Sequence, residues 1–123
     1  MYYGAGFRLL RDNANKGAHS IPISSQTVLV GDLLQLPVGA TDWTVCTSAS
    51  VSYTRKALAV ASAVSGDTEV LAIELDGSED VQVQSAGASL AADNGDRMAL
   101  TDKNTVNNSG TDVTTTTVGF IQR

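Results

Sequence analysis

The feature that most restricts the fold is a two-residue alternation of side chains in short segments that end in turn residues. Residues 68–75 show it best, because Leu71, Ile73 and Leu75 share one parity and the residues between them share the other. Successive side chains of a strand point to opposite faces of the sheet, so this pattern predicts a strand. The next two residues are Asp-Gly, a dipeptide typical of tight turns.

Short segments of this kind recur along the chain. Residues 85–92 and 102–110, which separate some of these segments, are predicted to be loops. The predicted strands are residues 26–30, 33–36, 43–46, 51–54, 56–64, 68–75, 81–84, 97–100, 113–117 and 118–121. Residues 56–64 are rich in alanine and also suit a short helix, but Leu58, Val60 and Val64 share strand parity, so we favour a strand. Strands spaced by about ten residues predict an all-β fold, a small single-domain β-barrel or sandwich of short antiparallel strands. A length of 123 residues fits one such domain.

The dipeptide Gly-Asp occurs three times, at residues 31–32, 66–67 and 95–96. Glycine allows a sharp change of direction, and an aspartate carboxylate accepts hydrogen bonds from nearby backbone N–H groups. No Gly-rich phosphate-binding motif surrounds these sites. Residues 93–96, Asp-Asn-Gly-Asp, match only part of a calcium loop, because the EF-hand spacing and its terminal Glu are absent. We therefore interpret all three dipeptides as turns into a new strand.

The first 20 residues differ in composition from the rest of the chain. Three of the six aromatic residues lie within the first seven positions. Exposed apolar clusters usually mark a contact, so residues 1–20 are predicted to be an extended N-terminal arm that docks on another protein. The alternative is a first strand of the domain that residues 21–123 form. The candidate contact residues are Tyr2, Tyr3, Phe7, Arg8, Leu9 and Leu10.

Charge argues against nucleic acid and membrane as partners. The net charge is −5, and the basic residues are scattered singly along the chain except at Arg55–Lys56. Nucleic acids and anionic lipids bind clusters of Lys and Arg, which this chain lacks. The start shows no signal-peptide pattern, no apolar run approaches the roughly 20 residues that span a bilayer, and a single cysteine allows no intrachain disulfide. We expect the protein to be made, and to stay, in a cytoplasm.

The titratable residues do not form a recognisable catalytic motif. The one histidine, His19, is expected to be solvated, and the one cysteine, Cys46, has the inward parity of a buried strand residue. No Gly-x-Ser-x-Gly motif is present. We therefore expect no enzyme activity, no metal site and no cofactor.

The order of the motifs points to a family. Residues 27–34 read Thr-Val-Leu-Val-Gly-Asp-Leu-Leu, residues 65–77 contain a second Gly-Asp turn and the alternating strand, and residues 117–121 read Thr-Val-Gly-Phe-Ile. This succession resembles the small β-barrel capsid decoration, or cement, proteins of tailed bacteriophages. The resemblance spans residues 26–121 and rests on short motifs, with no counterpart for residues 1–20 or for the region from Trp43 to Tyr53.

The resemblance implies a virion structural protein that is made in the bacterial host cytoplasm and binds the capsid exterior. Its implied partners are the major capsid protein, whose neighbouring subunits it would bridge, and other copies of itself in a trimer or dimer. The candidate contacts in residues 1–20 would then face the capsid or another subunit. Two alternatives remain: another β-rich virion component (tail tube, head completion or fibre base), and a ligand- or carbohydrate-binding β module. Trp43 and Tyr53 are the candidate aromatic residues of such a module.

Overall fold

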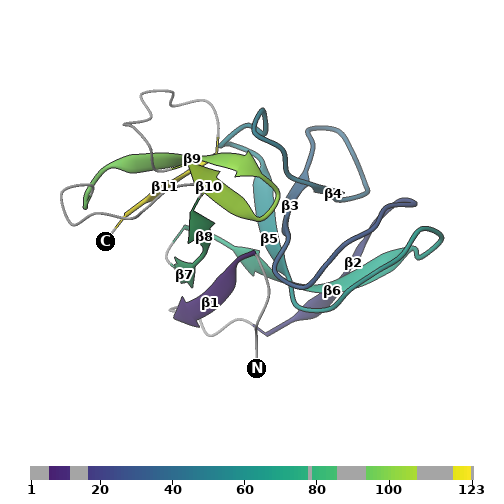
Figure 1. Cartoon of the computed structure of the whole chain (residues 1–123). Coiled ribbons are helices and arrows are strands. Elements are labelled where there is room, and N and C mark those ends of the chain that lie inside the picture. The colour runs from purple at the N-terminus through teal and green to yellow at the C-terminus, as the bar shows by residue number, and fades with distance from the viewer. Residues whose placement is uncertain (1–5, 12–16, 78, 86–93, 108–117, 123) are drawn as a thin grey trace.

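The strands pair into three sheets in the computed structural model, which describes residues 6–11, 17–77, 79–85, 94–107 and 118–122 (Figure 1). No helix occurs among these residues, and the predicted all-β class with short antiparallel strands is confirmed. The strands are β1 (Arg8–Arg11), β2 (His19–Pro22), β3 (Leu33–Leu36), β4 (Thr44–Val45), β5 (Arg55–Ala59), β6 (Glu69–Leu75), β7 (Asp80–Gln82), β8 (Gln84–Ser85), β9 (Arg97–Asp102), β10 (Thr105–Asn107) and β11 (Gly119–Ile121).

The largest sheet has five antiparallel strands in the order β2-β6-β5-β3-β4, and it curls towards closure. Ile23, just after β2, forms a bridge with Trp43, just before β4, and the Trp43 N–H donates to the carbonyl oxygen of Pro22 at 2.8 Å. The Gln26 amide extends this seam, since its Nε2 donates to the Trp43 carbonyl at 2.6 Å and its Oε1 accepts from the Val45 N–H at 3.1 Å. The backbone of β4 is thereby paired as a neighbouring strand would pair it.

The inside of the curl is a core to which β5 and β6 contribute mainly alanines, while the other strands and the loops contribute larger residues. Ala57, Ala59 and Ala72 project inward from β5 and β6, and each is at most 1% exposed. Because alanines occupy little space, the curl can be tight, and larger side chains from outside the two strands fill it. These include Ile23, Val28, Leu34 and Trp43.

The opposite face of the same sheet packs against a second sheet, in the order β11-β9-β10-β8. Leu34 and Ala57 are paired between β3 and β5 and point into the curl. The neighbouring pair, Leu33 and Leu58, points to this opposite face. The second core adds residues from β9, β10 and the segment around β11, which are Met98, Leu100, Val106 and Val118. The pairing of β10 with β8 is parallel, whereas the other strand pairs are antiparallel.

The described part of residues 1–20 forms strands of the domain. β1 pairs with β7 in a two-stranded sheet, and His19 and Ser20 belong to β2 of the five-stranded sheet. Phe7 is 1% exposed, packs against Phe120 with ring centroids 4.9 Å apart, and donates its N–H to the Gly31 carbonyl oxygen at 2.7 Å. For these residues the structure therefore matches the alternative of a first strand.

Four predicted segments differ from the structure, one of them only in part. Residues 26–30 form a loop with only an isolated bridge at Val28, because Leu29 and Val30 already belong to the turn of residues 29–32 and are exposed. Residues 51–54 form a turn after a bridge residue, and residues 105–107, predicted as loop, form β10. β5 covers only the first part of the predicted strand 56–64, because the chain is irregular beyond Ala59. The predicted strand 113–117 lies outside the described residues.

Candidate functional site

Two of the Gly-Asp dipeptides form the same turn. In residues 29–32, the buried turn, the Leu29 N–H donates to Asp32 Oδ2 at 2.9 Å and the Asp32 N–H donates to the Leu29 carbonyl oxygen at 3.0 Å. In residues 64–67, the surface turn, the Val64 N–H and Asp67 make the same two bonds at the same distances. The glycine before each aspartate has a positive φ, 92° and 104°. The interpretation of these dipeptides as turns is therefore confirmed for this pair.

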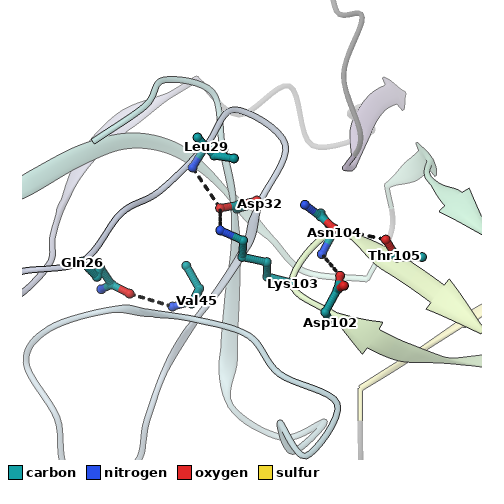
Figure 2. Close-up of polar contacts among 8 residues, drawn as sticks. All are labelled: Gln26, Leu29, Asp32, Val45, Asp102, Lys103, Asn104 and Thr105. Carbon is teal, nitrogen blue, oxygen red and sulfur yellow. Dashed lines mark hydrogen bonds and ion pairs between the residues drawn. The ribbon is translucent and has the colours of Figure 1, made fainter. Parts of the chain in front are cut away.

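The backbone of the buried turn also bonds to Phe7 and Ala59, and its carboxylate makes an ion pair that is not found for Asp67 among the described residues and that Figure 2 shows. Lys103, in the turn between β9 and β10, places its Nζ 2.9 Å from Asp32 Oδ2. The Asp32 side chain is 1% exposed and the Lys103 side chain 28% exposed. The Leu33 N–H donates to the Lys103 carbonyl oxygen at 2.8 Å, so backbone and side chain of this one residue both bind the five-stranded sheet. This ion pair fixes one sheet against the other and is structural.

The structure separates the candidate contact residues of the N-terminal segment. Phe7 lies in the second core, and Leu9 packs against that core while partly buried. Arg8 is exposed, and Leu10 is 59% exposed. Tyr2 and Tyr3 lie outside the described residues. Of the four described candidates, Leu10 thus offers the largest apolar surface to a partner.

Leu10 stands at one side of an open cleft of about 1060 Å³. Ile121, which is 58% exposed, lines the same cleft from β11. The apolar part of the lining comes from all three sheets and from the residue between β7 and β8, and includes Leu75, Val81, Val83 and Phe120. The charged and polar side chains of the lining include Ser52, Thr54, Arg55, Lys56, Asp76, Glu79 and Asp80. A concave apolar surface with a polar rim is the arrangement that protein partners commonly bind.

The loop of residues 51–54 borders the cleft and is held by one ammonium group. Lys56 Nζ donates to the carbonyl oxygens of Val51 at 2.8 Å and Thr54 at 2.6 Å, and to Thr54 Oγ1 at 2.6 Å. Burial lowers the pKa of Lys56. These three bonds explain why the predicted strand is a turn here, and the turn displays Tyr53, which is 74% exposed. An exposed tyrosine on a fixed loop suits protein contacts, because little conformational entropy is lost on binding.

The two residues tested for nucleophilic chemistry lie apart from this cleft lining. Cys46 is 2% exposed, and burial raises the pKa of its thiol to about 11, although Ser50 and Lys56 act in the opposite direction. A protonated, buried thiol is a weak nucleophile at neutral pH. His19 is exposed on β2, as predicted. No group of three His, Cys, Asp or Glu side chains suited to a metal ion was found in the described parts of the chain.

The sequence did not single out Ile121 or Val81 as contact residues. Residues 118–121 read Val-Gly-Phe-Ile, with no polar residue among them. That signal indicates a strand with apolar side chains on both faces, and in the structure Phe120 packs inward while Ile121 is exposed.

No helix of the described residues is long and apolar enough to cross a membrane.

Comparison with known proteins leaves the family open. No family model, no curated protein and no solved structure matches this chain. The fold and the cleft therefore carry the functional argument together with the motifs of the sequence.

Proposed function

We propose that this protein binds the outer surface of a tailed-phage capsid and stabilises the shell by bridging neighbouring major capsid subunits. The observation that carries the proposal is the apolar cleft with Leu10 and Ile121 exposed beside it and Tyr53 on a bordering loop. The proposed role is mechanical and non-catalytic. The resemblance of the sequence to decoration proteins supplies the identity of the partner.

A bridging role makes use of modest contacts at many sites. Each copy needs only one surface for a capsid subunit and another for a second subunit or a second copy, and repetition over the shell multiplies their effect. Burying apolar side chains such as Leu10 and Ile121 supplies binding free energy at about 25 cal/mol per Å² before the costs of association. The net charge of −5 favours the solubility of the many copies that such a coat requires.

Trp43 bears on the alternative of a carbohydrate-binding module. Its ring is 4% exposed inside the curled sheet, with the Arg55 guanidinium 5.4 Å from the ring centre. Of the two aromatic residues considered for stacking on a sugar, only Tyr53 therefore has an exposed ring. This observation favours the capsid proposal over the carbohydrate alternative.

The proposal is tested by adding the purified protein to capsids of its parent phage from which the protein has been omitted. We expect saturable binding at hundreds of copies per particle by quantitative gel analysis, the stoichiometry of a shell with many equivalent sites. Leu10→Asp and Ile121→Asp should abolish it, and Val38→Asp should not, because Val38 is 80% exposed in a turn outside the cleft. Binding to isolated tails and not to capsids would instead support a tail component.

The two tyrosines outside the described residues need their own test. Tyr2→Ala combined with Tyr3→Ala should weaken capsid binding if the first residues act as an arm, with the folded domain unchanged by circular dichroism. Removing residues 1–15 altogether is a poor test, because Phe7 belongs to the second core and its loss destabilises the domain.

A further inference from the structure

The turn before β9 contains a dipeptide with chemistry of its own. Asn94–Gly95 is the chain's one Asn-Gly pair, and both residues are exposed. Gly95 has a φ of 92°, and a Cβ added to it would meet nothing within 4 Å. Because glycine carries no side chain, its nitrogen is unusually accessible to the side-chain carbonyl of the preceding residue.

Gln122, at the end of β11, holds both groups of this dipeptide. The Gly95 N–H donates to the Gln122 carbonyl oxygen at 2.7 Å, and Gln122 Nε2 donates to Asn94 Oδ1 at 3.1 Å. Gln122 is itself fixed, since its N–H donates to the Asp96 carbonyl oxygen at 3.0 Å and the residue is 9% exposed. One residue thus engages a nitrogen and a carbonyl group that can react with each other.

We propose that Asn94–Gly95 is a site of spontaneous deamidation and that Gln122 protects it. The Gly95 nitrogen loses its proton and attacks Cγ of Asn94, forming a C–N bond that closes a five-membered succinimide. The Cγ–Nδ2 bond breaks, and the side-chain amide leaves as ammonia after taking up a proton. Water then adds to one of the two ring carbonyls and opens the ring to aspartate or isoaspartate. The reaction needs only water as co-reactant.

Protection follows from what the reaction must undo. For the reaction, the Gly95 nitrogen must lose its proton and the Asn94 side chain must turn until its Cγ meets that nitrogen. Gln122 opposes both steps, because it accepts a hydrogen bond from the Gly95 N–H and donates one to Asn94 Oδ1. Local opening of the segment around Gln122 is therefore the step that precedes reaction, and such local openings cost less free energy than global unfolding. The product places a new carboxylate close to Asp96 and, as isoaspartate, lengthens the main chain in the turn. Either change weakens the contact of β11 with the start of β9.

The test follows deamidation at this dipeptide in the full-length chain by peptide mapping and mass spectrometry, with isoaspartate resolved by chromatography. Folded protein, the same protein in urea, Gln122→Ala and a chain shortened by residues 122–123 are incubated together in mildly alkaline buffer. Gln82→Ala is the matched control, since Gln82 is exposed on β7. Asn94→Gln should remove the product, because the larger ring forms far more slowly.

We expect the folded protein to react several-fold more slowly than the chain in urea. Gln122→Ala should react faster than the folded wild type, the shortened chain should approach the rate in urea, and Gln82→Ala should match the wild type. Equal rates in folded and urea-unfolded protein, or no change in Gln122→Ala, would overturn the proposal. If the shortened chain does not fold by circular dichroism, the comparison of Gln122→Ala with Gln82→Ala decides the outcome alone.

Discussion

The buried turn and the surface turn have the same local structure in opposite environments. Both end in Gly-Asp with a positive φ at the glycine, and in both the aspartate carboxylate accepts a bond of 2.9 Å from the N–H three residues earlier. Asp32 is fully buried and paired with Lys103, whereas Asp67 is exposed. The two turns have the same shape because their local chemistry is the same, and we expect burial to determine how much stability depends on each.

Because Asp32 is buried, the groups that bind its carboxylate should contribute more to the free energy of unfolding than the same groups would at the surface. A carboxylate removed from water loses its hydration, and a partner must offset that loss. Lys103 Nζ and the Leu29 N–H both bind Oδ2, and no bond to Oδ1 occurs among the described residues. At Asp67 water can replace the turn bond if it breaks, so the same substitution has different consequences at the two sites.

The largest difference is expected for removal of the carboxylate. Asp32→Ala should lower the free energy of unfolding by about 3 kcal/mol, because it removes one partner of a buried ion pair. The value lies at the low end for such pairs because the Lys103 side chain is partly exposed and water can solvate its ammonium group. Urea denaturation monitored by fluorescence of the buried Trp43 measures it. Asp67→Ala is the control. Equal losses in both variants would show that burial does not distinguish the turns.

A double-mutant cycle separates the ion pair from the turn. Asp32→Asn keeps an oxygen that can accept the Leu29 N–H but removes the charge, and Lys103→Met removes the ammonium. Either change alone leaves one charged group without its partner, so the double variant should lose about 1–3 kcal/mol less than the sum of the single variants. Additive losses would mean that the pair contributes no coupling. Asp67→Asn should have almost no effect.

The glycines should behave more alike than the aspartates. Gly66→Ala should cost about 1–2 kcal/mol from backbone conformation alone, because φ is 104° and no atom lies within 4 Å of the added methyl group. Gly31→Ala incurs the same conformational cost at a φ of 92°. Because Gly31 is buried and Gly66 is exposed, the melting temperature of Gly31→Ala should be equal to or lower than that of Gly66→Ala. A neutral Gly66→Ala would indicate that the turn can change its conformation freely.

How much of this follows from sequence depends on the range of the interactions. The alternation in residues 68–75 predicts β6, and the structure places Val70 and Ala72 on one face and Leu75 on the other. The Gly-Asp turns were equally predictable, since their bonds lie within four residues. Both are local properties, and local chemistry is what a single sequence displays.

Contacts between distant segments were not predictable in this way. Phe7 looked like a contact residue because nothing in its neighbourhood predicts that Phe120 covers it. In the same way, Asp32 and Asp67 look alike in sequence, and what distinguishes them, the burial of Asp32 and its ion pair with Lys103, comes from distant segments. The apolar cleft combines residues of all three sheets, and of these residues the sequence predicts only Leu10 as a contact. Nonlocal pairing of this kind has no signature in a single chain.

The smallest expected effect tests the surface turn on its own. Asp67→Ala removes the acceptor of the Val64 N–H, but both residues are exposed, so water satisfies the freed group and the loss should stay below about 1 kcal/mol. Urea denaturation in parallel with Asp32→Ala gives the comparison under one set of conditions. A loss as large as that of Asp32→Ala would mean that the turn bond itself, and not the ion pair with Lys103, provides the stability. A small loss would locate that stability in the surroundings of Asp32, where the ion pair with Lys103 and the backbone bonds to Phe7 and Ala59 tie the buried turn to the rest of the domain.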